Sequence, residues 1–177
     1  MLAESARLHL EDLSFTDPIV RFDVEADEPA AAGADRITLL FASNAALQPG
    51  PVGRIASGGE LSRLVLALRL AGSAGEADIV AFDEIDAGIG GATALAMGRK
   101  LAALAESRQV LCVTHLPQVA AFAASHVVVT RDGNRVTVRV VNEQERIEEL
   151  SRMLAGLPDS DRGREHAEEL LALAARP

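Results

Sequence analysis

The middle of the chain carries residues suited to phosphate chemistry, beginning with Ser57-Gly58-Gly59-Glu60. This tetrapeptide stands where a long loop meets an amphipathic segment, and its serine and glutamate have the spacing of a capping box. The first backbone amides of a helix have no partner within the helix and attract anions, and glycine lets another group approach them closely. Taken alone, the tetrapeptide is more typical of a well-capped helix than of a phosphate site.

Two further groups follow apolar runs. Asp83-Glu84 comes directly after the run 79–82, and His115 follows the run 110–114. The carboxyl ends of parallel strands are where α/β sheets bind ligands, so Asp83 could hold Mg²⁺ through water and Glu84 could accept a proton from attacking water. If the two strands are neighbours, His115 could donate to a phosphoryl oxygen. Each group alone is more typical of an acidic turn or a strand-end histidine, but their order within 59 residues favours one nucleotide site.

The elements that would position these residues alternate between strand and helix, which predicts an α/β fold with a parallel sheet core, flanking helices, a small β-hairpin and C-terminal helices. Apolar periodicity predicts helices over 2–13, 58–71, 92–106, 117–124, 143–155 and 161–175. Alternating or short apolar runs predict strands over 19–24, 37–42, 79–82, 110–114, 126–130 and 135–141, with loops at 27–35 and 44–56. The apolar faces would comprise Leu61, Leu64, Val65 and Leu68 in one helix and Ala94, Met97, Leu101 and Leu104 in the next.

Composition excludes several classes of protein. With 177 residues of which 49% are hydrophobic, the chain can build a core and is not a disordered segment. Aromatic residues are only 3%, which argues against base stacking, and the net charge of −9 means that any DNA contact is a local patch or lies outside this chain. The single cysteine, Cys112, excludes an intrachain disulfide and a zinc site of cysteine pairs and suggests a reducing cytoplasm. The window 110–129 is too polar to span a membrane, and the N-terminus lacks the pattern of a signal peptide.

Taken together, the three motifs resemble those of ABC-type ATPases. SGGELSR at 57–63 resembles the signature motif, IVAFDEIDAGIGG at 79–91 resembles a Walker B strand with its D-loop, and VLCVTHLPQVAA at 110–121 resembles the H-loop segment. The combination of the sequences FDEIDAGIGG and THLPQVAA is more specific than the general ABC motifs. It resembles the RecN family of bacterial DNA-repair proteins, relatives of the SMC proteins, over most of the chain.

The resemblance implies a role for each motif residue. Ser57, Gly58 and Gly59, with Glu60 in the same signature motif, would bind the γ-phosphate of an ATP held by a second subunit. Asp83 would support Mg²⁺, Glu84 would polarise the attacking water, and His115 would contact the γ-phosphate. The D-loop would include Asp86, Gly88 and Gly90, although the wider ABC pattern has an aspartate where this chain has Gly90.

The Walker A loop, which an ABC-type ATPase needs to bind the phosphates of ATP, is absent from the sequence. A Walker A loop needs a Gly-Lys pair, and this chain has none, its only lysine being Lys100. The resemblance therefore implies a C-terminal head segment that lacks activity alone, with Met1 not the start of the whole protein. Its expected parts are the end of a coiled-coil arm (1–15), strands and loop leading to the signature (16–56), the motif core (57–141) and C-terminal helices (142–177).

For the intact protein, the resemblance implies ATP hydrolysis between two heads in double-strand break repair and recombination, in the cytoplasm at the nucleoid. The implied partners are the Walker A half of the same protein, a second copy of the head, and DNA through the intact protein, with no membrane. Two alternatives stay open: the head of another SMC-like ATPase, and a dimerisation module that hydrolyses nothing.

Overall fold

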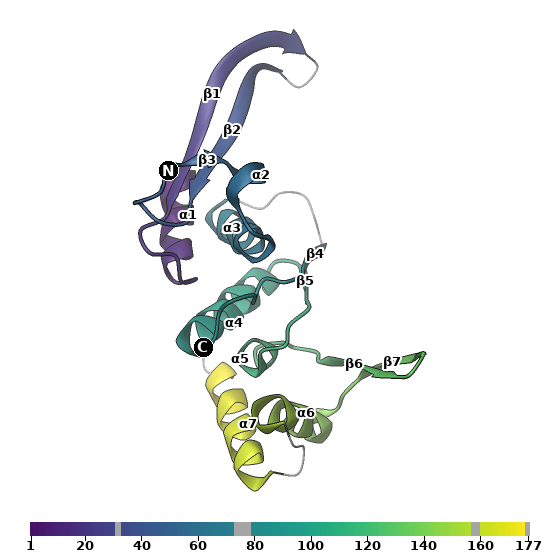
Figure 1. Ribbon diagram of the computed structural model, residues 1–177. Helices are drawn as coiled ribbons and strands as arrows, with labels where there is room; N and C mark the ends of the chain where they lie inside the picture. The colour runs from purple at the N-terminus through teal and green to yellow at the C-terminus, as the bar shows by residue number, and fades with distance from the viewer. Residues whose placement is uncertain (31–32, 73–78, 157–159, 176–177) are drawn as a thin grey trace. The chain divides into compact units, whose positions relative to one another are not determined.

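The computed structural model describes residues 1–30, 33–72, 79–156 and 160–175 (Figure 1). The chain forms two compact units, each described by itself below. The first comprises Met1–Ile89 with Ser107–Val113, and the second comprises Gly90–Glu106 with Thr114–Pro177. Within the described ranges, no helix is both long and apolar enough to cross a membrane.

The first unit begins with a helix and an antiparallel sheet. The elements are α1 (Leu2–Glu11), β1 (Ile19–Ala30), β2 (Gly33–Ala42), β3 (Gly50–Pro51), α2 (Val52–Ile55), α3 (Gly58–Ala71), β4 (Ile79–Phe82) and β5 (Gln109–Cys112). The sheet order is β1-β2-β3, and α1 packs against α3. The expected long loop at 44–56 therefore contains β3 and the short helix α2.

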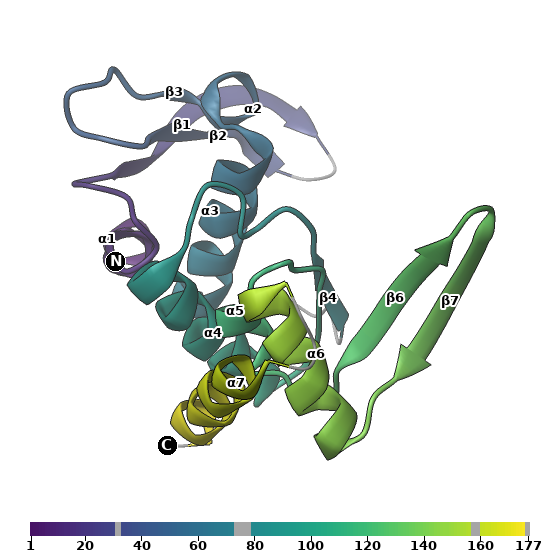
Figure 2. The same cartoon turned by 60° about the horizontal axis from the view of Figure 1, so that its bottom comes forward.

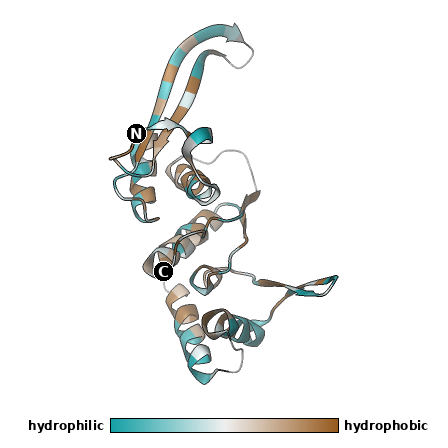
Figure 3. Ribbon diagram, in the orientation of Figure 1, coloured by the Kyte–Doolittle hydropathy of each residue, from teal (hydrophilic) through white to brown (hydrophobic). Residues whose placement is uncertain are grey.

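The β1–β2 hairpin is longer than predicted. Strand pairing continues past Val24 as far as Ala30 opposite Gly33, with an irregularity between Ala26 and Ala30, so the expected loop at 27–35 is mostly strand. Main-chain pairing between antiparallel strands does not require apolar side chains, and the Asp27 carboxylate accepts from Arg36 Nη2 at 2.8 Å across the hairpin. Figure 3 shows the resulting alternation of hydrophobic and hydrophilic bands along both strands.

Strands β4 and β5 are parallel, as predicted, and they meet the condition of being neighbours, with Phe82 opposite Cys112. They are not buried on both faces, however. Val80 and Phe82 are buried, whereas Ile79 is 57% exposed and Leu111 is 54% exposed. Short apolar runs such as 79–82 and 110–114 are typical of fully buried parallel strands. That interpretation is wrong for this chain, because within the described residues β4 and β5 form a two-stranded sheet.

Helix α3 has the predicted bounds but presents a different face to its neighbours. Leu61 and Val65, expected inside, are exposed, while Arg63, Leu64 and Leu66 are buried. The helix packs on α1, and this contact rather than the apolar repeat decides which side is inside. This orientation of α3 places the charged side chain of Arg63 in the interior of the unit.

The second unit is mostly helical. Its elements are α4 (Gly91–Ala105), α5 (Pro117–Ala120), β6 (Val127–Asp132), β7 (Arg135–Val140), α6 (Glu143–Ala155) and α7 (Asp161–Ala174). The predicted inward residues of α4 are all buried. The β6–β7 hairpin extends away from the helices of this unit (Figure 2), and α5 is shorter than the expected helix over 117–124.

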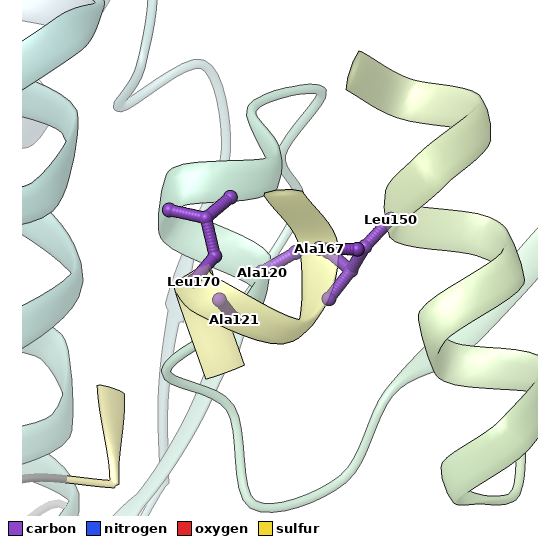
Figure 4. Close-up of a cluster of buried hydrophobic side chains, with 5 residues drawn as sticks. All are labelled: Ala120, Ala121, Leu150, Ala167 and Leu170. Atoms are coloured by element: carbon purple, nitrogen blue, oxygen red, sulfur yellow. The ribbon is translucent and has the colours of Figure 1, made fainter. Parts of the chain in front are cut away.

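Helices α5, α6 and α7 share one small hydrophobic cluster (Figure 4). It is built mainly from alanine and leucine, which pack closely without aromatic side chains. Its buried members are Ala120, Ala121, Leu150, Ala167 and Leu170.

Candidate nucleotide site

The start of α3 is a complete capping box. The Ser57 hydroxyl accepts a hydrogen bond from the Glu60 amide at 3.3 Å, and the Ser57 amide donates to Glu60 Oε2 at 2.9 Å. This backbone hydrogen bond is the main cause that lowers the pKa of Glu60. Ser57 and Gly58 are exposed, so the helix start faces solvent with two of its first donors already satisfied.

The two glycines of the signature motif lie against the loop that follows β4. A Cβ built on Gly58 would lie 2.9 Å from Glu84 Oε2. At Gly59 it would lie 3.0 Å from Ala87 Cβ and 3.1 Å from the Glu84 carbonyl oxygen. A side chain at Gly59 would displace the main chain of this loop, so close approach requires glycine there, whereas at Gly58 only the Glu84 side chain would have to move.

Side chains of α3 also bind the main chain of the same loop. Ser62 Oγ donates to the Asp83 carbonyl oxygen at 3.0 Å. Arg63 Nη1 donates to the carbonyl oxygens of Ile85 at 3.3 Å and Ala87 at 2.9 Å. The structure therefore brings the signature helix and the acidic loop together within the first unit, where residues 83–87 are held as an ordered turn.

Glu84 adopts an uncommon backbone conformation. Its φ is +55°, in the left-handed region that costs a side-chain-bearing residue about 1 kcal/mol or more. The Glu84 amide donates to Asp83 Oδ1 at 3.0 Å, and the Ala87 amide donates to the Glu84 carbonyl at 3.1 Å. Both carboxylates, Asp83 and Glu84, are exposed, whereas Ile85 and Asp86 are buried. The turn thus presents the two acidic groups to solvent and buries the residues that follow.

The remaining predicted site residues divide between the units. Asp86 and Gly88 belong to the first unit, while Gly90 and His115 belong to the second. The Val113 amide donates to the Phe82 carbonyl at 3.0 Å, which extends the β4–β5 pairing toward His115. His115 is exposed and follows Thr114, whose hydroxyl accepts from the Leu116 amide at 3.0 Å. Its role beside a phosphate stays a prediction.

A divalent cation would have few protein ligands here. Within the described residues there is no group of three or more His, Cys, Asp or Glu side chains that could hold a metal. The exposed Asp83 carboxylate suits Mg²⁺, which takes one or two carboxylates together with phosphates and water. Cys112 is unsuited to be a ligand, because burial and then the carboxylates of Asp86 and Asp83 raise the pKa of its thiol to about 11.

The sequence did not identify Arg63 as a functional residue, although Arg63 is the last residue of the signature-like motif at 57–63. The available signal was weak: a charged residue directly before Leu64 on an amphipathic helix ordinarily lies at the edge of the polar face. Only the carbonyl oxygens contributed by residues 22 and 24 positions later explain why this guanidinium is buried.

Comparison with solved structures defines the class of fold. The chain aligns with an SMC head domain from Pyrococcus yayanosii at a TM-score of 0.60, 17% identity, 99% of this chain and 29% of that one. It also aligns with a chain from a study of ATP-driven dimerization and DNA-stimulated activation of SMC ATPases, at a TM-score of 0.55, 15% identity and 86% and 91% coverage. The fold is therefore that of part of an SMC-type ATPase head.

Comparison with curated sequences is more specific. The chain is 49% identical to the DNA repair protein RecN of Streptomyces coelicolor over 148 residues, covering 81% of this chain and 26% of the relative. It is 44% identical to RecN of Mycobacterium tuberculosis over 192 alignment positions, covering 97% and 32%. No family model matches the chain. The sequence is that of a RecN homologue, as the motifs suggested, and it spans about a quarter to a third of the length of these relatives.

Proposed function

We propose that this chain is the C-terminal part of a RecN-type ATPase head, which binds and hydrolyses ATP in the intact protein and serves DNA double-strand break repair and recombination. The observation that supports this most directly is the contact between the signature-like helix start and the acidic loop. Gly58, Gly59, Ser62 and Arg63 all touch or bind residues 83–87. Such a constrained turn, with Glu84 at φ +55°, is typical of a functional site.

The proposed chemistry divides between two carboxylates. Mg²⁺, when bound with the nucleotide, neutralises charge on the phosphates. Asp83 would hold the ion, with its Oδ1 oriented by the Glu84 amide at 3.0 Å. Glu84 would orient the attacking water and accept its proton. Ser57, Gly58 and Gly59 would face the γ-phosphate of an ATP on a second head, and His115 would contact the γ-phosphate.

The other half of the head would supply the phosphate-cradling loop that this sequence lacks. Uncovered apolar residues support the need for further protein. In the first unit Ile79, Leu111 and Val113 are 57%, 54% and 67% exposed. In the second unit one face of the β6–β7 hairpin is apolar and exposed, comprising Val127, Val129, Val136, Val138 and Val140. Exposed apolar surface of this kind marks an interaction site.

The deciding experiment is Glu84→Gln in the whole protein. Hydrolysis should fall by about 10² to 10⁴, the loss expected for a general base, while ATP binding persists. Glu106→Gln is the matched control, since Glu106 is an exposed glutamate at the end of α4. Unchanged hydrolysis in Glu84→Gln would contradict the role of Glu84 as general base, whereas no hydrolysis by the unmodified whole protein would favour a dimerisation module that hydrolyses nothing.

A second experiment uses the chain by itself. Without a Gly-Lys loop it should release no phosphate from ATP, and mixing it with the Walker A half should restore turnover. Turnover by the chain alone, if abolished by Glu84→Gln, would overturn the split-head proposal. Halves that stay separate in size-exclusion chromatography would also contradict it.

A further inference from the structure

Arg63 is the buried charged residue on which the acidic loop rests. Its exposed fraction is 8%, and burial lowers the pKa of its guanidinium. Nη1 bridges the carbonyl oxygens of Ile85 and Ala87, at 3.3 and 2.9 Å. These two acceptors are two residues apart, so one nitrogen fixes the curvature of the turn that begins at Glu84.

The guanidinium of Arg63 also lies over an aromatic ring. Arg63 Cζ lies 5.1 Å from the centroid of Phe15, which is itself 6% exposed. Phe15 meets Phe41 edge to face, with centroids 5.5 Å apart and an interplanar angle of 83°. A cation over a desolvated ring is attracted by the electrons of its face, so the ring partly replaces the water that Arg63 has lost.

Phe15 in turn is hydrogen-bonded to the end of α1. Its amide donates to the Leu10 carbonyl at 3.2 Å, and the Leu13 amide donates to the same carbonyl at 2.9 Å. Leu10 and Leu13 are fully buried. A continuous set of contacts therefore runs from the end of α1 through Phe15 and Arg63 to the loop that carries Glu84.

We propose that Arg63 is a positioning residue that holds the 83–87 turn in the geometry needed for hydrolysis, and that Phe15 links this turn to the end of α1. The proposal rests on the function proposed above. Arg63 binds main-chain carbonyls, so replacing it removes no acidic group from the site. What its loss removes is the constraint on a strained residue, because the left-handed conformation of Glu84 persists only while its surroundings enforce it.

A guanidinium is suited to this task for a specific reason. Its donors are rigid and planar, whereas the single ammonium of lysine is flexible and strongly hydrated. The ammonium of Arg63→Lys could still offer donors to these carbonyls but would hold them less rigidly, so the variant should give an intermediate effect. Arg63→Met keeps the apolar stem and loses both hydrogen bonds.

The test measures hydrolysis and ATP affinity separately in the whole protein. Arg63→Met should lower kcat by about tenfold or more while the Kd for ATP changes by less than about threefold, with Arg63→Lys in between. Phe15→Leu, which keeps the arginine, should lower kcat by a few-fold. Arg69→Met, on the same helix, is the control and should leave both quantities unchanged.

The double variant separates positioning from general damage. In a Glu84→Gln background, Arg63→Met should cause little further loss of kcat, because both changes disable the same step. Losses that multiply would overturn the proposal, as would equal losses of kcat and ATP affinity or an unchanged kcat in Arg63→Met. If Arg63→Met does not fold, Arg63→Lys and Phe15→Leu decide by the same criteria. If Glu84→Gln itself hydrolyses normally, it is the proposed function that fails.

Discussion

Gly58 lies directly against the carboxylate of Glu84, so that a Cβ at this glycine would be 2.9 Å from Glu84 Oε2. The two residues belong to different motifs, 26 positions apart in the chain, and meet because the first turn of α3 packs on the loop after β4. Motifs that read as separate in the sequence therefore form one continuous surface of the first unit.

The two signature glycines should respond differently to alanine. At Gly59 the new methyl group meets the Glu84 carbonyl at 3.1 Å and Ala87 Cβ at 3.0 Å, so Gly59→Ala should lower the free energy of unfolding by about 1–3 kcal/mol. At Gly58 it meets only a side-chain oxygen that can move, so stability should change little. Gly53→Ala is the control, since nothing lies within 4 Å of that position. Urea denaturation measures all three, and equal effects at Gly59 and Gly53 would contradict the packing.

Glu84 should lower the stability of the folded protein while it supports ATP hydrolysis. Because its φ is +55°, replacing it with glycine relieves the strain, and Glu84→Gly should raise the free energy of unfolding by about 1 kcal/mol. The same variant should lose hydrolysis in the whole protein as Glu84→Gln does. Thermal denaturation and phosphate release measure the two effects. A glycine variant less stable than Glu84→Gln would indicate that the turn is not strained.

Ser57→Arg should affect the contact between heads rather than the binding of ATP. The exposed helix start would carry extra bulk and charge where the γ-phosphate of the second subunit is proposed to lie. In the whole protein, ATP affinity should stay nearly unchanged while ATP-dependent dimerisation, measured by light scattering, is lost. Because Ser57 also caps α3, Ser57→Thr is the control that keeps a neutral hydroxyl cap with little added bulk. Loss of ATP binding by the monomer would refute the role in trans.

Arg146 should stabilise the second unit strongly. Its Nη2 donates to the carbonyl oxygens of Ala120, Ala121 and Ala123, at 3.1, 2.9 and 2.6 Å, at the end of α5. Arg146→Met should therefore cost about 1.5–3 kcal/mol of unfolding free energy, the contribution of hydrogen bonds to a charged group.

The matched control for Arg146 is Arg152→Met on the same helix. Arg152 is exposed and forms an ion pair with Glu149 at 2.6 Å, three residues before it. Such a surface pair contributes about 0.5 kcal/mol or less. Similar losses in the two variants would show that the carbonyl contacts of Arg146 contribute little.

Acid should destabilise the second unit through His126. Burial, and then the charge of Arg146, lower the pKa of this imidazole below 6.5, although Glu149 opposes the shift. The unfolded chain then binds more protons than the folded one, so stability is full above about pH 6.5 and falls as the pH drops through the lower folded pKa. His126→Gln should flatten this pH dependence between pH 7.5 and 5. His166→Gln, at an exposed position of α7, should not.

Much of this protein could be predicted from local sequence. The capping serine begins α3, because a side chain that satisfies orphan amides marks a helix start without tertiary context. The two strands β4 and β5 and the position of the acidic pair after β4 also followed from short apolar runs, whereas the pairing of these strands with one another was only a condition. The similarity to the RecN family was evident from the residues of the motifs alone.

Tertiary structure decided what those patterns could not. The apolar repeat of α3 placed Leu61 and Val65 inside, yet they are exposed and Arg63 is buried. A periodic pattern reports where apolar residues lie around a helix, whereas burial of a charge depends on partners brought close by folding. For Arg63 those partners are the carbonyls of Ile85 and Ala87 and the ring of Phe15, all distant in sequence. The turn at Glu84 depends on folding for the same reason, since Ser62 and Arg63 of α3 bind its main chain in addition to the local hydrogen bonds of Glu84.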